Sequence, residues 1–191
     1  PDDWVELGYV SQMVELQNYY QTDLLCVGYY VDTDEKCVPA NEGQKPNCMD
    51  RVTAQQALLI PPKMGGFAWN KLYHLDIIRE HKLRFLDDVG TTEDLEFAFH
   101  YLKYCDTVCF VPSTRLYHYY QRSGAATHSE FSIKKMETIR TYEKIIESSE
   151  NDKLVQAAKE EICNTAINLI WQYQNSNLQD KAALKKLQRY A

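Results

Sequence analysis

The hydrophobic pattern of this 191-residue chain changes once along its length, and that change constrains the fold more than any other feature. Within residues 1–120, β-type apolar runs alternate with helical patterns, whereas from about residue 131 onward the apolar residues follow a helical period. This order predicts a mixed α/β unit, a sheet flanked by helices, followed by an all-helical tail. We place the boundary between residues 1–128 and 129–191, beside a small, polar, loop-like segment.

Individual elements follow from the same pattern. The segment 24–31 is an apolar run long enough for a buried strand, and two further β segments, 107–111 and 114–120, are separated by Pro112-Ser113. Residues 39–50 are rich in Pro, Gly and Asn, which is typical of a loop. Helices are expected over residues 4–20, 73–81, 131–148, 152–174 and 178–190. A further short helix is expected to follow a Thr53–Gln56 capping box and to end near residue 60, and another to start at Thr91–Asp94.

Charge and cysteine content exclude several classes of protein. The 27 acidic residues outnumber the 21 basic ones, so the net charge is -6 and no nucleic-acid interface is expected. No apolar run approaches the roughly 20 residues of a membrane-spanning helix, and the acidic N-terminus does not have the pattern of a signal peptide. The 6 cysteines show no CxxC pair and no zinc-type spacing to histidine. We therefore expect reduced, mostly buried thiols in a cytoplasmic protein.

Two pairs of adjacent carboxylates are candidates for chemistry. Asp2 and Asp3 could bind a hard divalent cation through oxygen, or could cap the helix that is expected to follow them. Glu93 and Asp94, at the start of a strongly periodic helix, could supply a general base, whereas Thr91 with Asp94 also has capping-box spacing. Local spacing favours capping in both cases, although a carboxylate that caps a helix can still act as a base.

Two further segments combine aromatic residues with residue types that bind ligands. Arg122 follows the aromatic run 117–121 and opens a Ser/Gly loop, so its planar guanidinium could clamp phosphate oxygens. It could equally be a solvated arginine beside an edge strand. Gly65-Gly66 lets the backbone approach a ligand on which Trp69 could stack, but the same residues could instead form a turn and fill the core.

Taken in order, these segments resemble a known series of motifs. The series is PDDW at 1–4, WNKLY at 69–73, RF at 84–85 followed by EDLEF at 93–97, and YHYYQRSG at 117–124. It resembles the C-terminal two-thirds of bacterial family-2 glycosyltransferases with the GT-A fold, over about residues 1–128. The resemblance implies inverting transfer of a sugar from a nucleotide-sugar donor to a saccharide or lipid-linked acceptor, in capsule, exopolysaccharide or glycolipid synthesis.

The resemblance assigns catalytic roles to the two carboxylate pairs. Asp2 would be the last aspartate of an Asp-x-Asp motif and would hold Mn²⁺ or Mg²⁺ against the diphosphate of the donor, with Asp3 as its neighbour. Asp94 would be the base that takes a proton from the acceptor hydroxyl, with Glu93 in support.

It also assigns residues that bind substrates. Arg122 would clamp the donor diphosphate with Ser123 and Thr127, although Ala125 stands where a phosphate-binding serine is expected. The acceptor side would be lined by Trp69, Asn70 and Lys71.

The family's nucleotide-binding half, roughly 90 to 100 residues, precedes the part that this chain matches. Without that half we expect weak binding of nucleotide-sugar and no turnover by the isolated chain. We also expect association with a second copy or with the missing half, because an incomplete domain exposes sheet edges and core surface. A lipid-linked acceptor would place the protein at the inner face of the membrane as a peripheral protein.

Two other functions compete with sugar transfer. An apolar stripe within residues 162–171 of the tail more often packs into a core, but as an exposed face it would make the chain a non-catalytic module that binds a protein partner. A hydrolase that uses Asp2 and Asp94 as a carboxylate pair is the third interpretation, although nothing in the sequence sets their separation. Replacing Asp94 by Asn separates the first two, because an interaction module tolerates that change.

Overall fold

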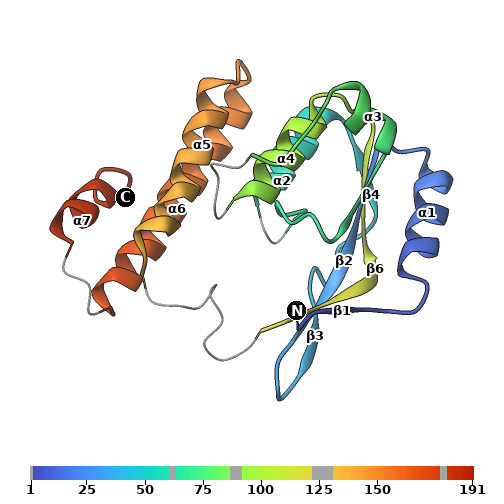
Figure 1. Cartoon of the computed structure of the whole chain (residues 1–191), viewed down its shortest axis with the longest axis horizontal. Coiled ribbons are helices and arrows are strands. Elements are labelled where there is room, and N and C mark those ends of the chain that lie inside the picture. Colours follow the sequence, from blue (N-terminus) through green and yellow to red (C-terminus); the bar gives the residue numbers. More distant parts are fainter. Residues whose placement is uncertain (1, 61–62, 87–91, 122–130, 177–179) are drawn as a thin grey trace.

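A computed structural model describes residues 2–60, 63–86, 92–121, 131–176 and 180–191 (Figure 1). It confirms a mixed α/β part followed by a helical tail. The strands are β1 (Trp4–Val5), β2 (Leu24–Asp32), β3 (Cys37–Pro39), β4 (Asn47–Met49), β5 (Lys71–Tyr73) and β6 (Val108–Tyr120). The helices are α1 (Tyr9–Tyr20), α2 (Arg51–Leu59), α3 (Leu75–Glu80), α4 (Glu93–Leu102), α5 (Glu137–Glu147), α6 (Asp152–Gln174) and α7 (Lys181–Leu187), with a 3₁₀ turn, η2, at Ile133–Met136.

Two long strands, β2 and β6, run parallel at the centre of the six-stranded sheet. Short antiparallel strands complete its two sides. β4 and β1 pair with the beginning and the end of β6, and β5 and β3 pair with the beginning and the end of β2. Every short strand therefore depends on one of the two central strands for its hydrogen bonds.

Both faces of the sheet are covered by helices, with α1 on one face and α2 and α4 on the other (Figure 1). Successive residues of β2 point to opposite faces. Leu25 and Val27 join Met13 of α1 in one buried cluster, whereas Leu24 and Cys26 belong to a larger cluster with α2 and α4. A strand buried on both faces has a continuous apolar sequence, which is why the pattern predicts β2 correctly.

The β segments expected on either side of Pro112-Ser113 form one continuous strand, β6, so the expected break is wrong. The register between β2 and β6 shifts at this point, beside Gly28. A Cβ atom added to Gly28 would lie 2.2 Å from the carbonyl oxygen of Pro112, so the close approach of the two strands requires glycine. The irregularity also accommodates a proline, which has no N–H group for the ladder.

The helix expected over 4–20 is wrong in its first part. Trp4 and Val5 form β1, paired with His118 and Tyr117 of β6, and α1 begins only at Tyr9. Pairing with a distant strand has overridden the local helical period. Neither Asp2 nor Asp3 caps a helix, because a strand follows them.

The helix α2 ends at Leu59, as expected, but its cap differs from the prediction. The Asp50 side chain caps it by accepting a hydrogen bond from the Thr53 N–H at 2.8 Å, so Thr53 is not the capping residue. The segment 39–50, expected as a loop, contains the strand β4. β4 forms by pairing with β6 and ends at Met49, which places Asp50 directly before the helix.

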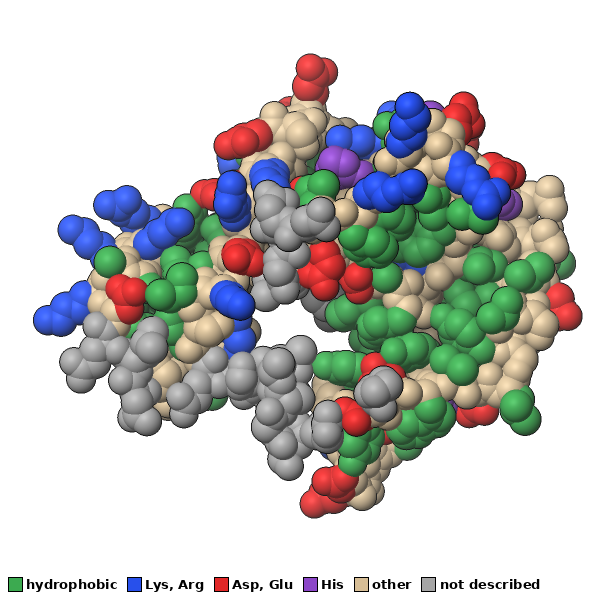
Figure 2. Space-filling view, in the orientation of Figure 1, with side chains coloured by type: hydrophobic (Ala, Val, Ile, Leu, Met, Phe, Trp, Pro, Cys, Tyr) green, Lys and Arg blue, Asp and Glu red, His purple; other side chains and the backbone are tan. Residues whose placement is uncertain are grey.

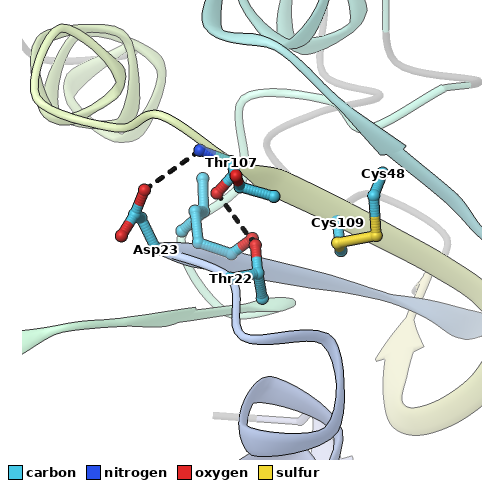
Figure 3. Close-up of a disulfide and its surroundings, with 6 residues drawn as sticks. Thr22, Asp23, Cys48, Thr107 and Cys109 are labelled. Atoms are coloured by element: carbon cyan, nitrogen blue, oxygen red, sulfur yellow. Dashed lines mark hydrogen bonds between the residues drawn. A yellow bond between two sulfur atoms is a disulfide. The ribbon is translucent and has the colours of Figure 1, made fainter.

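Cys48 of β4 and Cys109 of β6 are register partners and form a disulfide (Figure 3). The expectation of reduced thiols is therefore wrong for this pair. The spacing could not reveal it, because the two residues lie 61 positions apart and meet only through strand pairing. The free cysteines are Cys26, Cys37, Cys105 and Cys163.

Side chains just before β2 tie the beginnings of the two central strands together (Figure 3). Asp23 Oδ2 accepts a hydrogen bond from the Thr107 N–H at 3.0 Å, and Thr22 Oγ1 donates to the Thr107 carbonyl oxygen at 2.9 Å. These bonds fix the start of the parallel register between β2 and β6, which holds as far as the shift beside Gly28.

The helical tail shares its core with the α/β part. Residues of α5, α6 and α7 belong to the same buried cluster as α2 and α4. In the predicted stripe, Ile162, Ala166 and Leu169 are buried, whereas Trp171 is 63% exposed. The boundary predicted between residues 128 and 129 lies outside the described residues. None of the described helices combines the length and the apolar character needed to cross a bilayer.

Candidate active site

A pocket of about 350 Å³ lies where the 65–69 loop, the start of α4 and α5 of the tail meet. Figure 2 shows the molecule hollowed between the sheet part and the tail, with acidic side chains at the edge of the hollow. The pocket combines aromatic surface with two carboxylates. It is lined by Leu59, Gly66, Phe67, Trp69, Thr92, Glu93, Asp94, Leu95, Tyr119, Thr138 and Tyr142.

Asp94, in the first turn of α4, holds the loop that faces the helix. Its Oδ2 atom accepts a hydrogen bond from the Ala68 N–H at 3.0 Å. The helix is capped at Thr92 without a side-chain hydrogen bond, and the Thr92 hydroxyl pairs with that of Thr141 at 2.7 Å instead. Thr91, the other half of the expected capping box, lies outside the described residues. Asp94 thus bonds across the pocket wall, and the described residues provide no further hydrogen bond to its carboxylate.

Glu93 places a second carboxylate beside Asp94. Its Oε2 atom is buried and has no hydrogen-bond partner within the described part of the chain. Burying a carboxylate oxygen without a donor costs free energy. A ligand hydroxyl that donated to this atom would recover that cost.

A buried ammonium group holds the pocket loop from beneath. Lys71 Nζ donates to the carbonyl oxygens of Gly65 at 2.7 Å and Phe67 at 2.6 Å, and to Asn70 Oδ1 at 2.9 Å. Burial lowers the pKa of Lys71, and the nearby Asp94 carboxylate acts in the opposite direction. Asn70 and Lys71 are 1% and 5% exposed. Of the three residues predicted for the acceptor side, these two lie under the loop and support it.

Trp69, the third of those residues, lies in the pocket and links it to the N-terminal strand. Its ring stacks on Tyr117, with centroids 4.3 Å apart and planes at 14°. The Tyr117 hydroxyl donates to Asp3 Oδ2 at 2.8 Å, and the Tyr120 N–H donates to Asp3 Oδ1 at 2.9 Å. Burial first, and then the hydrogen bond to Asp3, raise the pKa of Tyr117, so its hydroxyl stays protonated as a donor. The structure thereby brings Asp3 to the aromatic group that lines the pocket.

Asp2 and Asp3 differ in what they can offer a cation. Asp3 already uses both oxygens to bind Tyr117 and Tyr120. Asp2 is exposed at the same end of β1. Mn²⁺ and Mg²⁺ take oxygen ligands from carboxylates, phosphates and water. Within the described residues, Asp3 therefore anchors the start of β1 to the end of β6.

Some site residues lie beyond the description or were not predicted. Arg122, Ser123 and Thr127, predicted to bind the donor diphosphate, lie outside the described residues. Thr138 and Tyr142 of the tail line the pocket, and no motif pointed to them. Their only signal is the helical period of α5, which does not tell which distant surface the helix contacts.

No protein-family model matches the chain. Over 122 residues it is 31% identical to the protein of Bacillus subtilis (strain 168) named "Putative glycosyltransferase EpsH", a match that covers 62% of this chain and 35% of that protein. It is also similar to the crystal structure of S. aureus TarS, with a TM-score of 0.57 and 10% identity over 100% of this chain and 33% of TarS. Against TarS 1–349 in complex with UDP-GlcNAc, the TM-score is 0.53 at 12% identity, covering 99% of this chain and 46% of that chain.

The chain thus spans about a third of EpsH and between a third and a half of the TarS chains. The likeness to TarS shows a shared fold, a mixed sheet flanked by helices with a helical tail.

Proposed function

We propose that this chain is the acceptor-side part of a glycosyltransferase and that Asp94 is its catalytic base. The observation that carries the proposal is the Asp94 carboxylate, which lines a pocket shared with Trp69 and has one oxygen bound by the Ala68 N–H, with no other hydrogen bond from the described residues. The similarity to EpsH and the fold shared with TarS support it. The more specific assignment to GT-A enzymes of family 2 rests on the order of the sequence motifs.

The reaction would be a single displacement at the anomeric carbon of the donor. Asp94 Oδ1 accepts the proton of an acceptor hydroxyl while that oxygen bonds to the anomeric carbon. The bond between this carbon and the diphosphate oxygen breaks, and the nucleoside diphosphate leaves with the electron pair. The transition state resembles an oxocarbenium ion, as in other glycosyl chemistry. One displacement with one base inverts the anomeric configuration.

The other groups of the pocket would bind and orient the acceptor. Tyr119 presents an aromatic ring to the pocket on which the apolar face of a sugar can stack, whereas the Trp69 ring already stacks on Phe67 and Tyr117 and supports this aromatic wall. Glu93 Oε2, which has no hydrogen-bond partner among the described residues, can accept a hydrogen bond from a second hydroxyl of the acceptor. Lys71 holds the loop in position, so the hydrogen bond from Ala68 can orient the Asp94 carboxylate.

The donor would lie on the side of Asp2 and Asp3. Mn²⁺ or Mg²⁺ bound there would neutralise the charge that develops on the leaving diphosphate. Asp2 would supply a ligand, while Asp3, held by Tyr117, fixes the direction in which β1 begins. We assign the diphosphate to Arg122, Ser123 and Thr127 on the motif resemblance.

The helical tail would contribute to recognition of the acceptor. Thr138 and Tyr142 of α5 form part of the pocket wall. The apolar stripe proposed for an interaction module is buried at Ile162, Ala166 and Leu169, so these residues are used for packing within the chain. That part of the stripe is therefore not available to a protein partner, whereas Trp171 remains exposed.

On the motif resemblance, we assign the acceptor to a saccharide or a lipid-linked saccharide, in capsule, exopolysaccharide or glycolipid synthesis. A lipid-linked acceptor would place the protein at the inner membrane face. Because a TarS chain was crystallised with UDP-GlcNAc, a UDP-sugar is the first donor to test.

The test is the Asp94→Asn variant of the polypeptide as its gene encodes it. UDP-GlcNAc and a panel of other nucleotide sugars would be supplied with saccharide acceptors, and the release of nucleoside diphosphate would be measured. Loss of a general base predicts a rate about 100- to 10,000-fold lower than that of the wild type. The circular dichroism spectrum should be unchanged, because asparagine can still accept the hydrogen bond from Ala68.

The matched control is Asp106→Asn, which neutralises an exposed carboxylate just after α4. It should retain the wild-type rate. A wild-type protein that turns over a nucleotide sugar at a rate unaffected by Asp94→Asn would refute the assignment of the base.

A further inference from the structure

A second cluster of ligating side chains lies on the other face of the sheet from the Trp69 pocket. Tyr117 and His118 are neighbours in β6, so their side chains point to opposite faces. Tyr117 stacks on Trp69, whereas the His118 ring lies between Trp4 and Tyr30, with centroid separations of 4.6 and 4.8 Å. The cluster is therefore separate from the proposed active site.

Two buried residues form the centre of this cluster. His118 Nδ1 lies 2.7 Å from Asp32 Oδ2, and the two residues are 7% and 3% exposed. The other Asp32 oxygen, Oδ1, is buried and has no hydrogen-bond partner within the described residues. On the far side of the ring, His118 Nε2 lies 3.1 Å from Glu6 Oε1. A buried carboxylate oxygen without a donor, beside an imidazole nitrogen, is an arrangement that a cation would complete.

The hairpin of β2 and β3 adds a thiol. Cys37 is the register partner of Asp32 across this hairpin. One ligand atom from each of Asp32, Cys37 and His118 lies within 4.8 Å of the others. Cys37 is exposed, so the cluster is open to solvent on one side. The sequence spacing could not show this group, because its members come from three strands.

We propose that Asp32, Cys37 and His118 form a binding site for Zn²⁺. His118 Nδ1, a carboxylate oxygen of Asp32 and the Cys37 thiolate are the three protein ligands. His118 Nε2–H donates to Glu6, the outer hydrogen bond that a metal-bound histidine usually makes to a carboxylate. Water takes the fourth, exposed position.

The donor set favours Zn²⁺ over the hard cations proposed for the donor side. One sulfur, one imidazole nitrogen and one carboxylate oxygen suit a borderline-soft ion, whereas Mg²⁺ and Mn²⁺ prefer oxygen. Tetrahedral zinc bonds of about 2.0–2.3 Å place ligand atoms roughly 3.3–3.7 Å apart. Binding therefore requires the 2.7 Å contact between Asp32 and His118 to open slightly and Cys37 to close in.

The site would join strands that are far apart in the sequence. It would hold the β2–β3 hairpin to β6, and through Glu6 it would fix the segment after β1 that follows Asp2 and Asp3. A metal that binds only the folded state stabilises it by mass action. We therefore expect Zn²⁺ to raise the thermal unfolding midpoint.

The test uses protein stripped with EDTA and then titrated with Zn²⁺, or with Co²⁺ as an absorbing probe, in the absence of nucleotide. The wild type should bind about one ion per chain, with a thiolate-to-cobalt absorption band and a higher unfolding midpoint. Cys37→Ser should lose the band and the shift in midpoint. Glu6→Gln should weaken binding about 10- to 100-fold, as expected for an outer-shell carboxylate.

Two control variants distinguish this site from other sources of binding. Cys163→Ser changes another free thiol and should bind Zn²⁺ like the wild type. Asp2→Asn alters the proposed donor-side site and should also leave Zn²⁺ binding unchanged. Equal Zn²⁺ affinity in the wild type and Cys37→Ser, or no binding by a folded wild type, would overturn the proposal. Because Cys37 is exposed on a hairpin, its serine variant should fold, and circular dichroism checks that it does.

Discussion

Lys71 shows how a single buried side chain can hold the loop of a candidate site from beneath. Its ammonium group is buried and is satisfied by the carbonyl oxygens of Gly65 and Phe67 and by Asn70. The loop thus held carries both Trp69 and the Ala68 N–H that binds Asp94. The geometry of the proposed base therefore depends on a charge beneath the pocket.

Replacing Lys71 by Met should destabilise the fold. The change leaves buried carbonyl oxygens without a donor, and hydrogen bonds from a charged group are worth about 1.5–3 kcal/mol each, so we expect a loss of about 3 kcal/mol. Urea unfolding followed by tryptophan fluorescence measures it. Lys63→Met, which removes an exposed ammonium next to the same loop, should change stability by less than about 0.5 kcal/mol. Equal midpoints for the two variants would contradict this role.

At the scale of secondary-structure elements, the short strands are held by their partners. β4 has three residues and is joined to β6 by backbone pairing and by the Cys48–Cys109 disulfide. Disulfides are rare in the reducing cytoplasm. The Cys48–Cys109 bond is therefore unexpected for the cytoplasmic location that the sequence analysis predicts.

Cys48→Ser should lower stability through the loop that the disulfide closes. A separation of 61 residues corresponds to about 4 kcal/mol in the loop-entropy account. Urea unfolding of the wild type under non-reducing conditions should show a higher midpoint than that of the variant, and dithiothreitol should remove the difference. Cys163→Ser is the control and should keep the wild-type midpoint. Six reactive thiols in the unfolded, unreduced wild type would show that the bond is absent.

The sequence predicts well those elements whose hydrophobic pattern does not depend on a partner far along the chain. β2 is a continuous apolar run, and the tail helices follow their own period. The sequence fails at β1, at β4 and at the disulfide, because short edge strands and cross-strand pairs are set by a partner far along the chain. The residues after Trp4 do follow a helical period, but Trp4 itself pairs with His118 and belongs to the strand β1.

The same distinction applies to the candidate site. Glu93, Asp94 and Trp69 were found because their segments carry local motifs, and all three line the pocket. Thr138 and Tyr142 were missed because only the packing of the tail brings them there. The zinc-site residues were missed for the same reason, since their spacing along the chain is unlike that of a zinc motif.

At the scale of the whole molecule, the pocket lies between the sheet part and the tail. Their helices share one buried cluster, and both contribute to the pocket wall. The tail is thus part of the proposed acceptor site, although its sequence contains no motif of its own. The proposed donor side lies at the start of β1, and the Asp3–Tyr117–Trp69 contacts connect it to the pocket.

The central claim is that a single carboxylate base, Asp94, supports one direct displacement. The most direct measurement is the anomeric configuration of the product, determined by proton NMR with the α-linked nucleotide sugar that the intact protein uses fastest. The account predicts a β-linked product, because one displacement inverts the anomeric carbon. An α-linked product would require two displacements or a different mechanism, and would contradict the role assigned to Asp94.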